Sequence, residues 1–249
     1  MPADGRALAP YTYDQMRIVV NHVTRMSSPR ICVAGINPET FEHVRPTTPQ
    51  TDPITRTLLR EEGGPFGMGA IVDLGEVVPE PSPPETEDHL FRTADARHVE
   101  DMAGDDFLEL LNEVSAPDLA SAFGSALERV GWKYAVEVGC GERSLAVVRP
   151  NKRLILAVDD KFGKLQLQFN DLDRPTYLPV TDVRFYEEDQ ATIETSVVED
   201  VARRLRRGVD AFLMLGLARA YQATNDDRER HWLQLNGLCL TDNPVGDTP

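Results

Sequence analysis

The sequence predicts a mainly β protein with accessory helices, an α+β chain built around two small β-barrels. Short stretches that alternate apolar and polar residues fill the second half, and short β-branched stretches fill the first. Glycine and proline turn signals separate these stretches. We therefore expect a first barrel over residues 15–80 and a second over residues 132–243.

In the first half, residues 1–14 are predicted to be a flexible tail. Strands are predicted at 17–23, 31–36, 41–45 and 68–78, where β-branched and apolar residues cluster. A proline-rich segment follows at 80–85, and proline removes a backbone donor and fixes φ. We expect an irregular linker over residues 81–103.

A helical segment is predicted at 104–131. Phe107, Leu110 and Leu111 recur at helical spacing, and Asp105 or Asp106 is expected to cap the helix. A second helix is expected from about residue 118 to residue 130. Gly131 is placed to end it.

The second half contains two predicted hairpins. One turns at Gly139-Cys140-Gly141 and the other at residues 160–163. The strand at 165–169 alternates strictly, so one face should be buried and the other wet. We expect five side chains of this half in the core: Leu165, Leu167, Phe169, Leu233 and Leu235.

A helix is predicted to interrupt this second sheet at 196–207, with Ser196 and Glu199 as a capping box. The apolar set of the last strand changes phase at Gly237, which predicts a bulge there. Residues 244–249 are predicted to be a tail.

Charge is unevenly distributed along the 249 residues, whose net charge is −15. Residues 73–128 hold 15 acidic and two basic side chains, whereas residues 129–164 hold eight basic and four acidic ones. The net charge argues against a general nucleic-acid coat protein, but the local surplus leaves room for a basic groove.

Other sequence features narrow the class of protein. Three distant cysteines, Cys32, Cys140 and Cys239, predict neither a zinc site nor a disulfide framework. The first residues lack an apolar signal core and no apolar run is long enough for a membrane span, which predicts a cytoplasmic protein without a membrane partner. No phosphate-loop, hydrolase or dinucleotide motif occurs, so we predict no enzyme, catalytic residue or cofactor. The donors between Glu87 and Glu100 lie in the predicted linker, and no metal site is predicted there.

Several short motifs recur in a recognisable order. They are Cys32-Val33-Ala34-Gly35-Ile36, Val44-Arg45-Pro46, Glu87-Asp88, Ser144-Leu145, Leu178-Pro179-Val180-Thr181-Asp182, Gly216-Leu217-Ala218-Arg219 and His231-Trp232-Leu233-Gln234-Leu235. In these the chain resembles the dual OB-containing domain family of prokaryotic conflict and antiphage defence systems. Val183 and Ala218 depart from its pattern. The resemblance implies two OB-like barrels and a role in sensing or holding nucleic acid, or in adapting an effector complex.

Nine residues are candidates for nucleic-acid contacts. They are Arg25, His43, Arg45, Arg149, Lys152, Arg153, Arg219, His231 and Trp232. Cations at strand ends and turns can contact phosphates, and His231 and Trp232 can stack on bases. Each has a structural alternative, such as pairing of Arg45 with Glu42 or core packing of Trp232. Arg203–Arg207 suits the C-terminal end of a helix, where cations are favoured.

These observations predict a non-enzymatic protein that binds or senses DNA or RNA within a prokaryotic defence complex. The alternative is a protein-interaction adaptor, whose acidic helical segment contacts a basic partner or excludes nucleic acid. Both hypotheses imply a protein partner. Neither fixes the oligomeric state.

Overall fold

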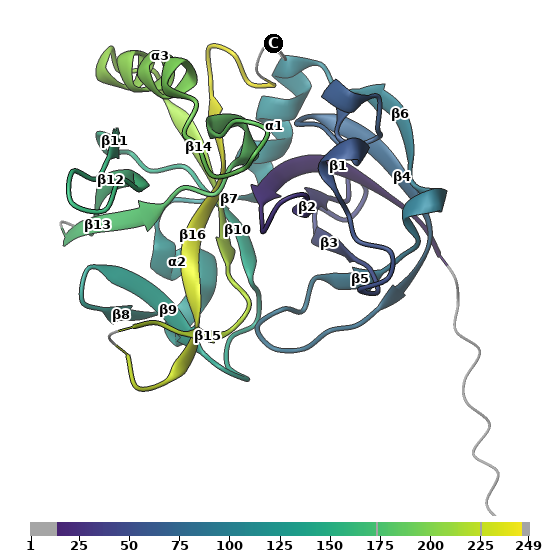
Figure 1. Ribbon diagram of the computed structural model, residues 1–249, viewed down its shortest axis with the longest axis horizontal. Helices are drawn as coiled ribbons and strands as arrows, with labels where there is room; N and C mark the ends of the chain where they lie inside the picture. The colour runs from purple at the N-terminus through teal and green to yellow at the C-terminus, as the bar shows by residue number, and fades with distance from the viewer. Residues whose placement is uncertain (1–13, 173, 225, 246–249) are drawn as a thin grey trace, which may run out of the picture.

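The computed structural model describes residues 14–172, 174–224 and 226–245 (Figure 1). Strands predominate among them and helices are few, so the mainly β class with accessory helices is confirmed. The predicted tails lie outside the described residues, apart from residues 14, 244 and 245. No helix within the described ranges is long and apolar enough to cross a membrane.

From residue 14 to residue 101, the described part of the first half holds six strands and three 3-10 helices. They are β1 (Asp14–Arg25), β2 (Ile31–Ile36), β3 (His43–Thr47), η1 (Arg56–Leu58), η2 (Arg60–Glu62), β4 (Ala70–Pro79), β5 (Asp88–Leu90), η3 (Thr93–Asp95) and β6 (Arg97–Asp101).

The first five strands pair in a closed circuit. β1 pairs with β2, β2 with β3, β3 with β5, β5 with β4, and β4 with β1 again; β6 pairs with the outer edge of β4. β3 and β5 run parallel, and the other pairs run antiparallel. β1 serves two neighbours because it is 12 residues long and bulges between Val20 and His22. It crosses β2 so closely that a Cβ on Gly35 would lie 2.7 Å from the Val19 carbonyl oxygen.

The first sheet extends beyond the predicted boundary at residue 80. The predicted linker at 81–103 contains β5 and β6, because its prolines interrupt only residues 81–84. Asp88 then pairs with Arg45 of β3, and His89 pairs with Pro79 of β4.

The remainder of the chain holds three α-helices and ten strands among the described residues. They are α1 (Gly104–Val114), β7 (Ser115–Ala116), α2 (Leu119–Phe123), η4 (Gly124–Ala126), β8 (Glu128–Val130), β9 (Lys133–Glu137), β10 (Leu145–Val148), β11 (Ile155–Val158), β12 (Leu165–Asp171), β13 (Arg174–Pro179), η5 (Val183–Phe185), α3 (Thr195–Arg206), β14 (Ala211–Leu217), β15 (Tyr221–Gln222) and β16 (Glu229–Leu240).

Pairing in the second half follows the order of the first. β11, β12 and β13 form one antiparallel sheet, and β13 meets β16 through a parallel bridge between Val180 and Leu235. β16 pairs with β14, and β14 pairs with β10. β10 and β11 together therefore take the place that β1 holds alone in the first half. α3 lies in the chain between β13 and β14, as η1 and η2 lie between β3 and β4.

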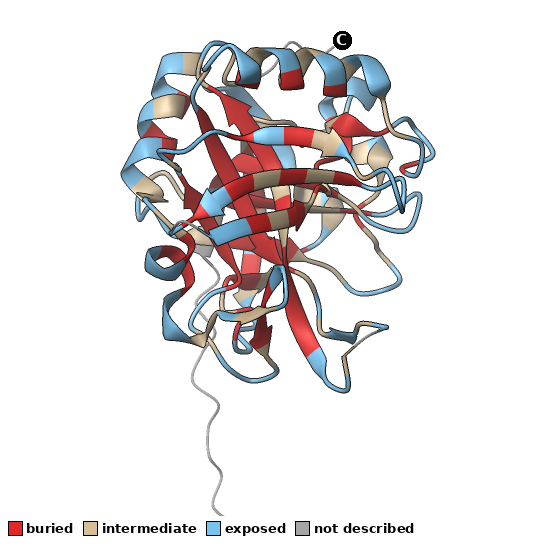
Figure 2. Cartoon of the chain, turned by 90° about the vertical axis from the view of Figure 1, so that its left-hand side faces the viewer, coloured by how far each residue is buried: buried red, intermediate tan, exposed pale blue. Residues whose placement is uncertain are grey.

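The burial pattern of the second half follows its sequence. Leu165, Leu167, Phe169, Leu233 and Leu235 are all buried, as predicted. Figure 2 faces the side on which β11–β13 lie, and buried residues alternate there with intermediate and exposed ones along the front strands. The bulge is confirmed, because the register of β14 and β16 shifts between Leu235 and Gly237.

Four local predictions were wrong. Neither Asp105 nor Asp106 caps α1, because the helix begins at Gly104 behind Ala103 and both side chains lie in its first turn. β9 and β10 do not form a hairpin: β9 pairs with β8 and β16, because Gly139 and Gly141, both at positive φ, lead the chain away from β9. The helix expected over 118–130 ends at Phe123, because Gly124 adopts φ 71°. The cap of α3 is Glu194, whose side chain accepts from the Ser196 N–H, and not the Ser196–Glu199 box.

The two halves share an apolar cluster around α1, which Figure 1 shows between the two groups of strands. Phe107 and Leu111 of α1 pack there against Val19 of β1 and Met214 of β14. A backbone hydrogen bond also joins the two halves, because the Arg25 N–H donates to the Thr181 carbonyl at 2.8 Å.

Candidate nucleic-acid interface

Three of the predicted contact residues meet in a cluster of charges between the halves. Arg45 is only 5% exposed, and its Nε donates to Asp88 Oδ1 at 2.6 Å. Arg219 donates to Asp88 Oδ2 at 2.6 Å and lies 3.1 Å from Glu85 Oε1. His231 Nδ1 lies 3.0 Å from the Ala218 carbonyl and 3.4 Å from Glu85. The partner of Arg45 is thus Asp88 and not Glu42.

A third carboxylate of this cluster holds the halves together through the backbone. Glu87 Oε1 accepts from the N–H groups of Ser144 and Leu145 at 2.7 and 3.0 Å, and Oε2 accepts from the Ser144 hydroxyl at 2.9 Å. The sequence motifs Val44-Arg45-Pro46, Glu87-Asp88, Ser144-Leu145 and Gly216-Leu217-Ala218-Arg219 therefore converge on one junction.

Arg25 and Trp232 also have internal partners. The Arg25 guanidinium donates to the Gln190 carbonyl at 2.7 Å and lies 3.9 Å from the centroid of the Tyr186 ring. Trp232 is 5% exposed, and its Nε1 donates to the Tyr221 carbonyl at 3.2 Å.

Arg149, Lys152 and Arg153 lie in the exposed connection between β10 and β11. Arg149 donates to Asn112 Oδ1 of α1 at 2.9 Å and covers the Phe212 ring. His43 begins β3, in the other half of the molecule, where burial and then Arg143 lower its pKa to about 4. The nine predicted residues therefore do not form one surface.

The outer face of β12 and β13 offers side chains that sequence reasoning did not select. Leu156, Leu167 and Leu178 pair across the three strands and are buried, so their neighbours in the next row point outward. That outward row is Ile155, Gln168 and Tyr177. It presents one apolar, one amide and one aromatic side chain side by side.

Trp132 extends this face beyond the edge of β13. The hairpin of β8 and β9 turns at Gly131, which adopts φ 64°, and Trp132 is left 62% exposed. Its ring meets Tyr177 edge-on at 6.0 Å between centroids, and its carbonyl accepts from the Tyr177 N–H at 3.4 Å. Arg129 donates to the Pro175 carbonyl at 2.9 Å and lies 5.8 Å from the Trp132 ring.

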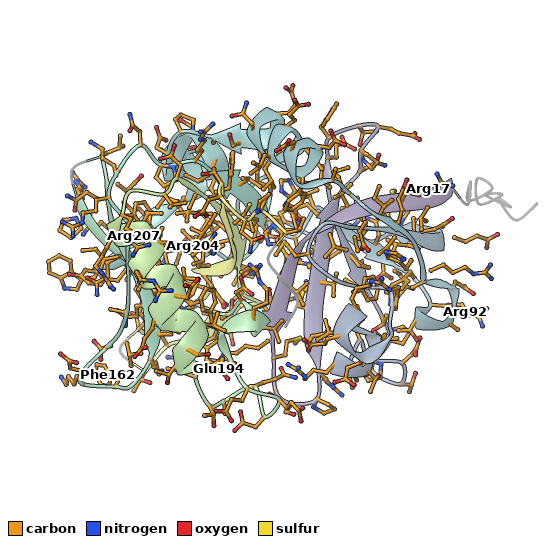
Figure 3. All side chains as sticks on the ribbon, turned by 90° about the horizontal axis from the view of Figure 1, so that it is seen from above. Arg17, Arg92, Phe162, Glu194, Arg204 and Arg207 are labelled. Atoms are coloured by element: carbon orange, nitrogen blue, oxygen red, sulfur yellow. The ribbon has the colours of Figure 1, made fainter. Side chains whose placement is uncertain are left out.

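The turn between β11 and β12 supplies a third aromatic side chain. Asp159 Oδ1 accepts from the N–H groups of Lys161 and Phe162 at 3.1 and 2.7 Å, which orders the turn. Phe162 is 65% exposed and projects at the outer end of the second half (Figure 3). Lys161 Nζ lies 4.9 Å from its ring centroid, and Lys164 completes the turn.

This arrangement, hereafter the aromatic face, comprises Arg129, Trp132, Lys161, Phe162, Gln168 and Tyr177. Exposed rings can stack on nucleobases, amide groups can bond base edges, and the cations can contact phosphates. The alternation of residues 165–169 had already predicted a wet outer side for this strand. The signal that was missed is Trp132 directly after Gly131, since a tryptophan at a tight turn has little room to become buried.

Comparison with known proteins gives a family but no close relative. The sequence model of the dual OB-containing domain matches residues 16–238. No curated protein and no solved structure matches the chain.

Proposed function

The chain belongs to the dual OB-containing domain family, and from this premise we propose that it binds single-stranded nucleic acid on the aromatic face. The pairing order supports an OB barrel in each half, with β10 and β11 together standing for the first strand of the second barrel. β12 and β13 are then its second and third strands. OB barrels bind oligonucleotides on those strands and the adjoining loops.

The observation that carries the proposal is that exposed rings of the second half lie beside cations. Trp132 and Phe162 are 62% and 65% exposed, and each lies beside a cation, Arg129 or Lys161. Apolar rings at such exposure gain free energy when a flat ligand covers them. Single strands present unstacked bases to rings, whereas a duplex hides them, so we expect a preference for single strands.

Acidic residues elsewhere limit the affinity. The net charge of −15 repels a polyanion over the screening length of the buffer, so binding should weaken steeply as salt increases. The proposed function is that of a binding module and not of an enzyme. A place in a prokaryotic defence complex stays a prediction from the family resemblance.

A titration of labelled 12-nucleotide single strands and duplexes of DNA and RNA, at two salt concentrations, tests the proposal. Trp132→Ala and Tyr177→Ala should each weaken single-strand binding about tenfold, since one base stack contributes on the order of 1–3 kcal/mol. Trp132→Phe keeps a ring and should retain most of the affinity. Absence of single-strand binding at low salt, or equal affinity of the wild type and both alanine variants, would reject the aromatic face.

The acidic side of α1 favours the adaptor as the second candidate. Asp105, Asp106, Glu109 and Glu113 are all exposed on this helix, and none forms an ion pair with any residue the structure describes. A basic protein partner would complement that surface. If nucleic acid does not bind, capture of such a partner by the wild type but not by a charge-neutralised α1 would establish this alternative.

A further inference from the structure

A cavity of about 260 Å³ opens where the first half meets the second. Its walls come from the loop before β3, the C-terminal end of α1, α2 and the start of β10. None of the residues of the aromatic face lines it. The side chains that give it chemical character are Phe41, His43, Glu113, Ser121 and Arg143.

Arg143 is the cation of this cavity. The clamp of Glu87 on the N–H groups of Ser144 and Leu145 fixes the backbone just after it. Within residues 14–172, 174–224 and 226–245, no carboxylate forms an ion pair with Arg143. Arg143 is exposed, so its guanidinium is accessible to an external anion.

His43 lines the same cavity. Its Nε2 is buried and has no hydrogen-bond partner among the described residues. The ring lies edge-on to His22 at 5.9 Å, and His22 is itself buried with both nitrogens unpartnered in the described structure. Because Nε2 is closed to solvent, the imidazole contributes wall surface to the cavity and no direct hydrogen bond to a ligand.

Phe41 also lines the cavity. It is 47% exposed and adopts φ 61°, a left-handed conformation that the Phe41 N–H stabilises by donating to the Asn37 carbonyl at 2.8 Å. Ala122, Ala146 and Val147 add apolar lining. The cavity therefore offers Arg143 to an oxyanion and apolar and aromatic surface to a flat ring.

We propose that this cavity binds a nucleoside 5′-monophosphate, free or as the 5′-terminal nucleotide of a strand. The phosphate pairs with Arg143, and the base lies against Phe41. A volume of about 260 Å³ admits one nucleotide and not two. Glu113 opposes further negative charge, which favours a monophosphate over a triphosphate.

Calorimetric titration of the whole chain with AMP, CMP, GMP and UMP tests this site, with adenosine and inorganic phosphate as fragments. We expect saturable binding of at least one monophosphate, and weaker binding of both fragments. Arg143→Gln should weaken that binding at least tenfold. Arg92→Gln is the matched control, because Arg92 is an exposed arginine on the far side of the first half (Figure 3).

Two further variants separate the ends of the ligand. Phe41→Asn, which tolerates the left-handed backbone, should weaken monophosphate binding and leave inorganic phosphate unaffected. Glu113→Gln should strengthen the binding of ATP more than that of AMP. The proposal is overturned if no monophosphate binds at millimolar concentration, if adenosine binds as tightly as AMP, or if Arg143→Gln behaves like Arg92→Gln.

The source of the nucleotide is decided with a tetranucleotide carrying a 5′-phosphate or a 5′-hydroxyl. If the phosphorylated strand binds more tightly than AMP, and Arg143→Gln abolishes that tighter binding, the natural ligand is a strand end. Tighter binding of AMP identifies a free nucleotide, and both results support the cavity. Trp132→Ala should leave AMP binding unchanged, so the cavity and the aromatic face can fail independently.

Discussion

β2 and β12 hold equivalent places in the pairing order of the two halves, but their burial differs. In β12 the outward Gln166 and Gln168 alternate with the buried Leu165 and Leu167. In β2 every residue except Cys32 is buried, on both sides of the strand. The outer side of β1 and β2 packs against α1 and the second half, with Val19 and Ile36 in the cluster that includes Phe212.

The comparison shows that strands in equivalent places of the pairing order are used differently in the two halves. The first half uses its outer strand face to attach the second half, through apolar packing and the charge cluster at Asp88. The second half leaves the equivalent face open, with rings and amides outward. The family motifs belong mainly to the attachment, which explains why the arginines in them have carboxylate partners.

The largest expected effect comes from breaking the attachment. Asp88→Asn leaves the buried Arg45 without its counter-charge and removes a partner of Arg219, so we expect a loss of roughly 3–5 kcal/mol in the free energy of unfolding. Urea denaturation measures it. Asp95→Asn, which disrupts an exposed pair 3.8 Å long, should change stability by less than about 0.5 kcal/mol. Similar effects of the two variants would show that the cluster does not hold the halves together.

A core substitution tests the inner side of the open sheet. Leu167 is fully buried, and Leu167→Ala should cost roughly 2–5 kcal/mol through the cavity it leaves. Gln168→Ala, one residue along and outward, should cost little. A loss below about 0.5 kcal/mol for Leu167→Ala in chemical denaturation would contradict the assigned face.

Acid should destabilise the covered face of the first half. Burial, followed by Arg143, lowers the pKa of His43 from its usual 6.5 to about 4, and burial, His43 and Arg45 lower that of His22. The unfolded chain therefore takes up protons first, and stability is greatest above pH 6.5 and falls as the pH drops toward 4. His43 alone accounts for roughly 3 kcal/mol of that loss.

Urea denaturation across this pH range, on the wild type and on His43→Gln, measures the effect. The variant should lose less stability between pH 6.5 and 4 than the wild type. Parallel profiles for the two proteins would show that His43 does not titrate as its burial implies.

The smallest expected effect concerns single cations on the open face. Lys161→Gln should weaken single-strand binding similarly for all sequences. It should also reduce the slope of log K against log salt concentration by about 0.7, because one phosphate contact is lost. Arg203 of α3 pairs with Asp200, and Arg203→Gln should leave the salt dependence unchanged. A larger effect of Arg203→Gln than of Lys161→Gln would move the nucleic-acid path to α3.

The sequence by itself determined the local elements of this protein. The alternation at 165–169, the helical spacing of Phe107, Leu110 and Leu111, and the phase change at Gly237 each depend on neighbours along the chain, and all three were predicted correctly. Periodicity decides which side of an element is apolar, and the residues that set it lie within one short stretch of sequence.

The tertiary structure alone decided which partners the charges meet and which strand face stays open. Asp88 lies 43 residues from Arg45 and 131 from Arg219, and the chain offers 41 acidic residues among which no local pattern chooses. The local sequence could not determine the path of the turn at residues 139–141 either, because β9 pairs with β16, which follows almost a hundred residues later. Ion pairs and open faces arise only when distant segments dock, since Coulomb attraction and burial depend on distance in space and not along the chain.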